Sequence, residues 1–485
     1  MTRNWLRIVA LVVFSVSLAV LPAFPQAARG RGPTNRASRA APALEAELAG
    51  AASSTRGQVT IVDIGTLTGR PTAGFGINQA GDVAGTSYVT GTIGQIGGPP
   101  AEPFIGHAVL YSGGSLQDLG AIEGGSLCSP LGCDSHAFDI NASRWVVGGN
   151  DGDYGLLAVA WLPQDIPGGS AGPNVLPRLA SQFGAEAAAV NDAGIIVGRS
   201  SPDGIGPRAV RWEFATGGPV VSDLGTLRAD GSGYAVANAI NTEGEIVGAA
   251  SDDTGYNKAF LFLPEPAYGL PAGMNDLMAG IDAYGHGAGV NVHGEVAGEI
   301  ELGVPWIWLP SPAYGLPAGL SLLPMPAPIV AFFPDAISDA GQIVGQAYVQ
   351  TNPRTRDYVI KPALWRNGHF TMLEDVLPPR SPWILYSASD VVHVGKTTRI
   401  TGNGGIQGVV DSIGLTPASR GYVLSVTCTG DLDDDGDVDA VDLAAQRAHL
   451  GESVPPGTDG DLDGDGDVDA SDVALLARQI GGPCL

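Results

Sequence analysis

Short apolar runs alternate with glycine-rich turns along residues 58–427, and one pattern of apolar and polar positions recurs through them. The pattern is an apolar pair, Asn, two residues, Gly, one residue, two apolar residues and a second Gly. Self-similarity at a fixed period is the sequence signature of a repeat architecture. Six copies are centred on Asn78, Asn141, Asn191, Asn241, Asn291 and Ser338, with a degenerate seventh near Ser389-Asp390.

Each copy predicts a β-hairpin followed by two further strands. Asn and the Gly that follows supply turn geometry, and the flanking runs are short, apolar and partly β-branched. The predicted third strands share a central apolar run: His107–Tyr111, Ala209–Trp212, Ala259–Phe262, Trp306–Trp308 and Ala363–Trp365. A fourth run often ends in Asp-Leu-Gly, as at Asp118–Gly120 and Asp223–Gly225. Four strands in a repeat of about 50 residues predict a propeller blade.

The strand count predicts a closed ring. A fourth-strand phrase at Val62–Leu67 precedes the first full repeat, and the last repeat has a third strand at Gly421–Ser425 without a fourth. We therefore predict that residues 59–67 pair with residues 420–426. The result is a mainly β chain with a seven-bladed propeller, because closure removes exposed sheet edges. An open β-solenoid is the competing architecture.

These repeats resemble the HAF-repeat family of bacterial extracellular proteins over most of residues 58–425. The His-Ala-Phe part is degenerate here and is kept best at His107-Ala108-Val109. The resemblance implies location and architecture, and it implies no activity.

Two Asp-rich segments close the chain, at residues 430–442 and 460–472. They agree at 11 of 13 positions, at an offset of 30 residues. Counted from the first Asp, carboxylates fall at positions 1, 3, 5, 9 and 12, and Gly436 and Gly466 fall at position 6, where a calcium loop turns sharply. The position-7 residues would offer backbone carbonyls. The predicted calcium ligands are therefore Asp431, Asp433, Asp435, Asp437, Asp439 and Asp442 in loop one, and Asp461, Asp463, Asp465, Asp467, Asp469 and Asp472 in loop two.

The match departs from an EF-hand, because position 12 is Asp and no helix enters either loop. Both departures resemble a type I dockerin, and so do the helices predicted at Leu443–Leu450 and Val473–Ile480 after the loops. We expect residues 428–485 to be a small α-helical dockerin that binds two calcium ions. A solvated acidic tail would not repeat the Gly and the full ligand set, and magnesium prefers fewer protein ligands.

The dockerin resemblance implies a cohesin-type protein partner. In dockerins, loop positions 10 and 11 help to choose that partner, and here they are Ala440, Val441, Ala470 and Ser471. Arg447 and Arg478 on the following helices would add contacts. The residues at these positions differ between the two loops, which leaves a dual binding mode open.

The N-terminus predicts an export signal over residues 1–28, followed by a flexible leader over residues 29–57. Arg3 and Arg7 precede an apolar run, Ile8–Leu21, and small residues at 23–28 suit cleavage. A retained anchor helix is the alternative. We expect a secreted protein, associated or not with the cell surface, and no membrane partner after cleavage. The cleavage site is not defined by the sequence.

The net charge and the cysteines of the chain further limit the ligands and metals that it is expected to bind. The net charge is −25, and residues 428–485 hold 14 Asp and one Glu against two Arg. Such a chain suits hard cations and excludes nucleic acid, whose phosphates need Lys and Arg. Cysteines of an exported protein are expected to form disulfides. Four cysteines allow three pairings, and proximity in the sequence favours Cys128–Cys133 with Cys428–Cys484. Zinc is disfavoured because no CxxC spacing or His pair accompanies these cysteines.

No catalytic constellation stands out. The seven His are scattered, and no nucleophile elbow or phosphate loop is present. We favour a non-catalytic scaffold whose propeller binds a protein or a glycan, such as a polysaccharide or a cell-surface glycan. The alternative is a glycoside hydrolase or polysaccharide lyase that the dockerin delivers to a polysaccharide-degrading complex. A pair of carboxylates from different blades would favour this alternative, and sequence cannot show one.

Overall fold

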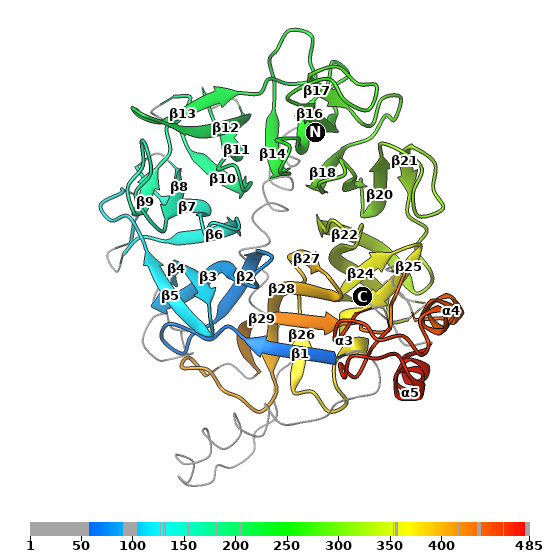
Figure 1. Cartoon of the computed structure of the whole chain (residues 1–485). Helices are drawn as coiled ribbons and strands as arrows, with labels where there is room; N and C mark the ends of the chain where they lie inside the picture. Colours follow the sequence, from blue (N-terminus) through cyan, green and yellow to red (C-terminus); the bar gives the residue numbers. More distant parts are fainter. Residues whose placement is uncertain are drawn as a thin grey trace. The chain divides into compact units, whose positions relative to one another are not determined.

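The computed structural model describes residues 58–90, 104–126, 128–129, 132–153, 155–180, 183–202, 206–352, 354, 357–414, 417–433, 438–458 and 460–480. The predicted signal peptide and leader lie outside these residues. The strands form seven antiparallel sheets, each a blade of a β-propeller, and Figure 1 shows the blades arranged around a ring. The predicted fold is therefore confirmed, and the open solenoid is wrong.

Six blades are consecutive four-stranded sheets. Blades 1 and 2 are β2 (Thr72–Ile77), β3 (Val83–Thr90), β4 (Ile105–Ser112) and β5 (Ser115–Gly120), then β6 (Ser135–Ile140), β7 (Val146–Asp151), β8 (Leu156–Leu162) and β9 (Gly172–Val175). Blades 3 and 4 are β10 (Ala185–Val190), β11 (Ile196–Ser200), β12 (Arg208–Ala215) and β13 (Gly218–Asp223), then β14 (Ala235–Ile240), β15 (Ile246–Ser251), β16 (Asn257–Leu263) and β17 (Gly273–Asp276). Blades 5 and 6 are β18 (Gly285–Val290), β19 (Val296–Ile300), β20 (Val304–Leu309) and β21 (Gly319–Leu322), then β22 (Ile329–Ile337), β23 (Ile343–Gln350), β24 (Tyr358–Arg366) and β25 (His369–Met372).

Blade 7 combines the two ends of the repeat region. Its strands are β26 (Trp383–Leu385), β27 (Asp390–Val394), β28 (Thr397–Ile406), β29 (Ala418–Thr427) and β1 (Gln58–Asp63). β1 pairs with β29 from Gln58↔Thr427 to Asp63↔Tyr422, and the two strands lie side by side in Figure 1. The predicted closure is confirmed, although β1 ends at Asp63 and not at Leu67. The inner strand of the degenerate repeat is divided into β26 and β27, which both pair with β28.

Apolar residues from neighbouring blades pack against each other and form a separate core in each interval of the ring. Ala297, Leu309, Phe332 and Trp365 are buried in the interval between blades 5 and 6. The short helix α3 (Leu373–Val376) follows blade 6, and Leu373 packs in the interval between blades 6 and 7. Each sheet therefore depends on both neighbours to cover its faces, as in other repeat architectures.

Asparagine side chains join the hairpin turns of successive blades. The Nδ2 of Asn78 donates to the backbone oxygen of Asn141 at 3.1 Å, and Asn141 donates in the same way to Asn191 at 2.9 Å. The series continues from Asn191 to Asn241, from Asn241 to Asn291 and from Asn291 to Ser338, at 2.9, 2.8 and 3.1 Å. These amides are buried, so each bond satisfies polar groups that water does not reach.

The two remaining intervals of the ring use other side chains. Ser338 replaces the asparagine of blade 6, and Gln342 Nε2 donates to Thr398 Oγ1 of blade 7 at 2.8 Å. Asp390 of blade 7 accepts the backbone N–H of Ile77 in blade 1 at 2.8 Å. The ring is therefore hydrogen-bonded through blades whose sequence departs from the repeat.

We refer to the side of the ring that carries these hairpin turns as the turn face and to the opposite side as the loop face. β29 ends and β1 begins at the turn face, because Thr427 pairs with Thr397, the first residue after a hairpin turn. The backbone N–H of Cys428 donates to the oxygen of Lys396 in that turn at 2.9 Å. The C-terminal module therefore joins the propeller on the turn face.

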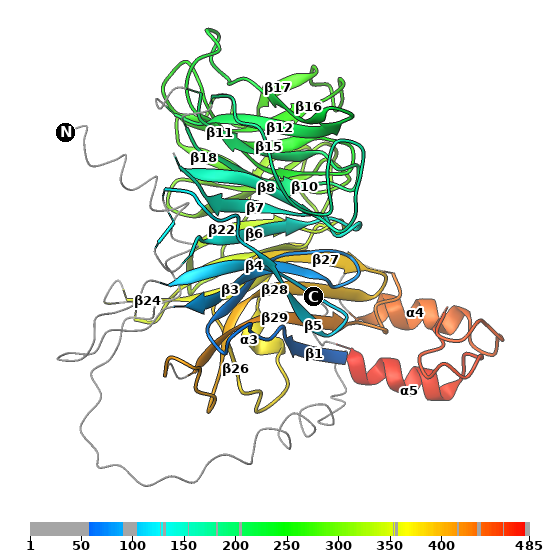
Figure 2. The same ribbon diagram turned by 90° about the vertical axis from the view of Figure 1, so that its left-hand side faces the viewer.

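The C-terminal module contains α4 (Ala440–Ala448) and α5 (Ala470–Gln479), each preceded by an Asp-rich loop. The two helices contact each other, and Figure 2 shows both at the end of the chain. They begin three residues before the predicted starts at Leu443 and Val473. Asp439 and Asp469 cap the helices by accepting the N–H groups of Val441 and Ser471 at 2.6 Å, so each helix begins inside its loop.

Removal of β1 is expected to open the ring. A chain that starts at residue 73 lacks the outer strand of blade 7 and exposes the edge of β29, which makes it aggregate or lose cooperative unfolding. A chain that starts at residue 56 keeps β1 and serves as the control. Thermal unfolding followed by light scattering compares the two, and identical transitions would contradict closure by β1.

Candidate metal centre

Each Asp-rich loop gathers carboxylate oxygens at one point. Asp461, Asp463 and Asp472 place ligand oxygens within 4.8 Å of one another, and Asp431, Asp433 and Asp442 do the same in loop one. The first and last Asp of each loop, positions 1 and 12, are buried. Buried carboxylates are costly without a compensating charge or hydrogen bonds. The arrangement therefore favours a cation.

Backbone N–H groups fix the carboxylates at positions 1 and 12. Asp461 accepts the N–H groups of Gly464 and Gly466, at 2.7 and 2.9 Å. Asp472 accepts those of Leu462 and Asp469, at 2.7 and 2.8 Å. In loop one, Asp442 repeats the contacts of Asp472, with Leu432 at 2.6 Å and Asp439 at 2.7 Å. Position 12 thus has the same contacts in both loops.

Position 12 serves both the loop and the helix. Asp442 and Asp472 are the third residues of α4 and α5, and each accepts the N–H of the capping Asp in a capping box. A carboxylate at a helix N-terminus is also favoured by the helix dipole. Asp replaces the Glu of an EF-hand here, and its shorter side chain reaches the loop because the helix begins within the loop.

Glutamine side chains form hydrogen bonds between the two halves of the module. Gln446 of α4 donates to the oxygen of Gly460 at 2.8 Å, just before loop two. Gln479 of α5 accepts the N–H of Gly430 at 3.0 Å, just before loop one. The backbone of Val468 bonds to Gly451 and Glu452 after α4. Val438 and Val468, which hold position 8 of the two loops, are both buried.

Like charges crowd the second loop. Burial and then the charge of Asp465 raise the pKa of Asp463, and the charge of Asp465 is the main cause that raises the pKa of Asp467. Burial would also raise the pKa of Asp461, but the N–H groups of Gly466, Gly457 and Gly464 outweigh it and lower that pKa. A divalent cation bound among these groups would relieve their mutual repulsion.

The donor set fits calcium. The three gathered groups contain only Asp, so the ligands are hard oxygens at alternate positions of a loop with Gly466 at a positive φ of 96°. Asp439 and Asp469 at position 9 are engaged as helix caps, a position that often binds calcium through water. Asp435, Asp437 and Gly436 lie outside the described residues, so part of loop one stays a prediction. When bound, the ion supplies positive charge and ties each loop to the start of its helix.

The predicted partner-binding residues are open to solvent. Ala440, Val441, Ala470 and Ser471 are exposed, and Val441 is 53% exposed. Arg447 and Ala470 line one apolar hollow together with Leu450, Val468 and Val473. The structure therefore brings part of the set to one surface between the end of α4 and the start of α5. The side chain of Arg478 lies outside the described residues.

The chain contains disulfide bonds, as the sequence predicted. Cys128 and Cys133 form a disulfide in the segment before blade 2. Cys428 is also disulfide-bonded. Cys484 lies outside the described residues, so its predicted pairing with Cys428 stays a prediction.

Two carboxyl groups of neighbouring blades interact electrostatically in the propeller. Glu299 of blade 5 and Asp335 of blade 6 are half-buried. Burial raises the pKa of Glu299 to about 7 against a hydrogen bond from the Gly303 N–H. Burial raises the pKa of Asp335 to about 7 as well, opposed by a bond to Gln346 and assisted by the charge of Glu299. Sequence reasoning missed both residues, because their proximity depends on how blades 5 and 6 pack.

A second pair of carboxyl groups has a structural explanation. Asp390 of blade 7 and Asp139 of blade 2 occupy the same position on their inner strands, and burial raises their pKa values to about 8 and about 6. Both carboxyls accept backbone N–H groups of the following blade, from Ile77 and Val190, at 2.8 Å. They therefore contribute to blade packing.

Residues 429–481 match the dockerin type I domain family. Such domains bind calcium, which agrees with the carboxylate clusters in both loops. No curated protein matches the chain. Among the described residues, no helix is long and apolar enough to cross a membrane.

Solved structures similar to the chain are distant. A mutant of puromycin hydrolase complexed with PGG has 13% identity and a TM-score of 0.40, over 72% of this chain and 53% of that one. The chain thus spans about half the length of that protein. The β-propeller domain of the Trilobed protease from Pyrococcus furiosus has 10% identity and a TM-score of 0.33, over 64% and 100%. Polysaccharide lyase Uly1 has 11% identity and a TM-score of 0.30, over 77% and 99%.

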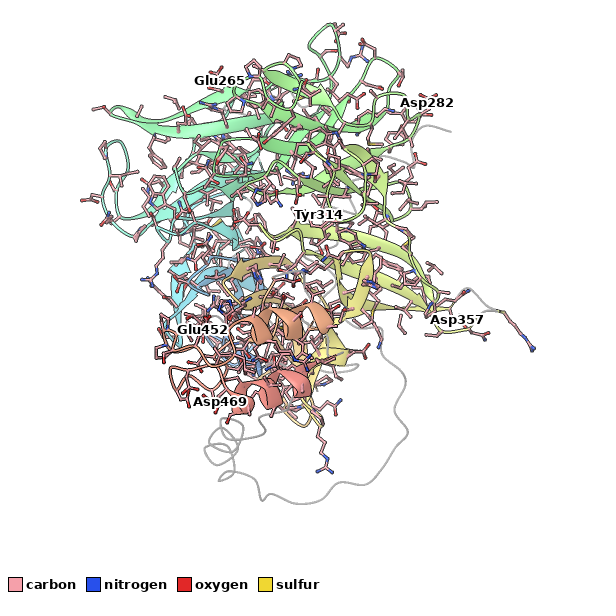
Figure 3. The ribbon with its side chains drawn as sticks, turned by 45° about the vertical axis from the view of Figure 1, so that its right-hand side comes forward. Glu265, Asp282, Tyr314, Asp357, Glu452 and Asp469 are labelled. Carbon is pink, nitrogen blue, oxygen red and sulfur yellow. A yellow bond between two sulfur atoms is a disulfide. The ribbon has the colours of Figure 1, made fainter. Side chains whose placement is uncertain are left out.

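Calcium is expected to stabilise the C-terminal module. Calorimetric titration of the chelator-treated chain should give two calcium ions per chain, and Asp472→Asn should give one, because it weakens loop two. At free calcium a hundred times the dissociation constant, one site adds about 2.7 kcal/mol to the module. Proteolysis should therefore cut within residues 428–485 only after chelation. The control is Asp282→Asn, an exposed carboxylate outside the loops (Figure 3). A titration with no binding heat would contradict this expectation.

Proposed function

We propose that this chain is an exported, non-catalytic binding protein that a dockerin attaches to a larger assembly. The observation that carries the proposal is the match of residues 429–481 to the dockerin type I domain, together with two loops whose carboxylates converge. Dockerin domains dock to cohesin domains and occur in secreted proteins of cellulosome-type complexes. The partner is therefore a cohesin-type domain, and the two calcium ions hold the module in its binding form.

The cohesin-binding surface is formed by loop positions 10 and 11 and the exposed sides of the helices. Two surfaces are available, one at Ala440 and Val441 and one at Ala470 and Ser471. The second surface adjoins the apolar hollow that Arg447 and Leu450 help to line. Positions 10 and 11 carry no charge in either loop, which agrees with the depletion of charged residues at the core of an interface. Their difference, Val441 against Ser471, gives the two surfaces unequal affinities for a given cohesin.

The propeller is the platform that the dockerin carries. Its repeats resemble HAF repeats of extracellular proteins, and this resemblance, like the signal peptide predicted from the sequence, agrees with an exported protein. The dockerin joins the turn face at Cys428, which leaves the loop face for a protein or glycan ligand. Binding sites in proteins are often formed by loops that a rigid framework positions.

The cohesin surface is testable by charge substitution. The full chain is tested for binding to a panel of type I cohesin domains by surface plasmon resonance. Ala470→Asp should weaken the bound cohesin at least about tenfold if the second surface is used, and Val441→Asp if the first is used, because a carboxylate would be buried without a partner. The same substitution at an exposed strand residue of blade 3, Val220→Asp, is the control. Calcium-independent binding, or no binding to any cohesin, would refute the proposal.

A second candidate function is a carbohydrate-active enzyme, and the pair Glu299 and Asp335 favours it. Glycoside hydrolases use two carboxyl groups, one of them with a raised pKa as the general acid. His286 Nδ1 lies 3.7 Å from Glu299 Oε1, and burial lowers the pKa of His286 to about 4, so this imidazole is neutral at pH 7. With pKa values of about 7, both carboxyls of the pair hold their protons below neutral pH.

Enzymatic activity is tested on a polysaccharide panel by assay of new reducing ends and unsaturated products. If the pair is catalytic, Glu299→Gln or Asp335→Asn should lower the rate about 10²–10⁴-fold. The rate should fall as the pH rises through about 7, where the raised carboxyls lose the protons that an acid catalyst donates. Asp282→Asn is the control. Absence of products from every polysaccharide would leave the non-catalytic function.

A further inference from the structure

The first three strands of blade 6 are extended on the loop face. Its strands β22, β23 and β24 have nine, eight and nine residues, and β23 and β24 remain paired up to Gln350↔Tyr358. The corresponding first three strands of blade 5 have six, five and six residues. The added length forms a strand pair that extends past its neighbour, with Asp357 at its far end in Figure 3.

Three aromatic rings follow one another across this extension. Phe333 is on β22, Tyr348 on β23 and Tyr358 on β24, so the rings belong to three adjacent strands. The ring centroids of Phe333 and Tyr348 are 5.1 Å apart, and those of Tyr348 and Tyr358 are 5.0 Å apart. The rings are tilted by 53° and 44° to their neighbours. We call these three residues the aromatic row.

Polar groups lie beside the inner end of the aromatic row. Gln346 is opposite Phe333 in the strand pairing and two residues before Tyr348, so it shares their side of the sheet. Asp335 sits at a shift in the β22 register, which releases its side chain from the strand alternation, and it bonds to Gln346. Glu299 of blade 5 interacts electrostatically with both Tyr348 and Asp335. The row thus ends at an amide and two carboxyl groups.

The outer end of the row is open to solvent. Tyr358 is 54% exposed and Ile360, on the same side of the sheet, is 45% exposed. Phe333 and Tyr348 are half-buried. Exposed apolar surface with polar groups beside it marks a binding site more often than a random surface does. Burial of Tyr358 and Ile360 under a ligand would remove this surface from water.

We propose that the aromatic row is a binding site for a neutral polysaccharide, with sugar rings stacked on Tyr358 and Tyr348 and hydroxyls bound by Gln346 and Asp335. This inference rests on the proposed function in that it names the ligand of the platform. A sugar ring has an apolar face of C–H groups and an edge of hydroxyls, so it needs both flat aromatic surface and polar partners. A wholly apolar peptide would use the aromatic rings and make no use of the amide and carboxyl groups beside them.

Charge favours a neutral chain over an anionic one. Glu299, Asp335 and Asp357 are acidic groups in or beside the site. Among the described cations nearby, Lys361 is engaged with Glu374 at 2.7 Å, and Arg354 is on the adjoining loop. Glu299 and Asp335 lose their protons as the pH rises through about 7, and above that pH their charges, with that of Asp357, would repel an anionic polysaccharide. The position also suits an attached protein, because the row is on the loop face and Cys428 leaves from the turn face.

Affinity electrophoresis of the full chain tests this site. The native gels contain xylan, mixed-linkage β-glucan, galactomannan or, as the anionic probe, polygalacturonate. At least one neutral polymer should retard the chain, and polygalacturonate should not. Tyr358→Ala should weaken that retardation at least about fivefold, since the sugar loses its stacking surface. Tyr358→Phe keeps the ring and should retain it, and Asp335→Asn separates loss of charge from loss of polar contact.

Val220→Ala removes a similarly exposed apolar side chain from blade 3 and is the matched control. Melting curves of each variant show whether lost binding reflects lost folding. No retardation by any neutral polymer, equal retardation of Tyr358→Ala and the wild type, or retardation by polygalacturonate alone would overturn the site. A chain that binds cohesin but no polysaccharide would overturn this inference and leave the docking function standing.

Discussion

The antiparallel pairing of β1 with β29 joins the two ends of the repeat region, Gln58 to Thr427. The blades depend on this closure because each sheet covers its faces only with apolar residues of both neighbours. The series of asparagine amides around the turn face also links each blade to the next one, since each side chain donates a hydrogen bond to the backbone of the following blade. Where the asparagine is lost in blade 6, Gln342 and Asp390 take over the hydrogen bonds to blades 7 and 1.

Closure by the outer strand also decides where the ligand-binding parts lie. β29 runs antiparallel to β28 and ends on the turn face, where β1 begins, and so the segment that begins at Cys428 leaves from that face. The loop face carries the extension of blade 6 and its aromatic row. The two proposed binding surfaces thus leave the propeller at opposite faces, and neither needs to compete with the other for space. Figure 2 shows β24 and the two helices on different sides of the propeller.

The repeat pattern predicted the fold because the residues that define it act locally. Asn241 and Gly244 make a turn by themselves, with Gly244 at a φ of 81°, and apolar strands follow at fixed spacing. The Asp loops could also be predicted from the sequence, since every ligand of a loop lies within twelve residues. The inter-blade bond of each asparagine was missed, because the pattern shows a turn residue and not its neighbour in space. Glu299, Asp335 and the aromatic row were missed for the same reason: they come from strands that only the ring brings together.

The acidic module and the propeller have separate requirements. The loops concentrate carboxylates that a cation must balance, whereas the propeller needs closure and apolar contact between blades. In the proposed function, calcium controls attachment without being needed for the ligand-binding face. This independence would allow the chain to connect a cohesin-bearing protein with a polysaccharide.

The most direct measurement is a bridging assay with an immobilised cohesin that binds the chain. Fluorescent neutral polysaccharide is passed over the cohesin in the presence of the chain and calcium. The account predicts that polysaccharide is retained, that chelator releases polysaccharide and chain together, and that cohesin alone retains none. Retention of the chain without polysaccharide, for a polymer that binds the free chain, would contradict the account because the two surfaces would then exclude each other.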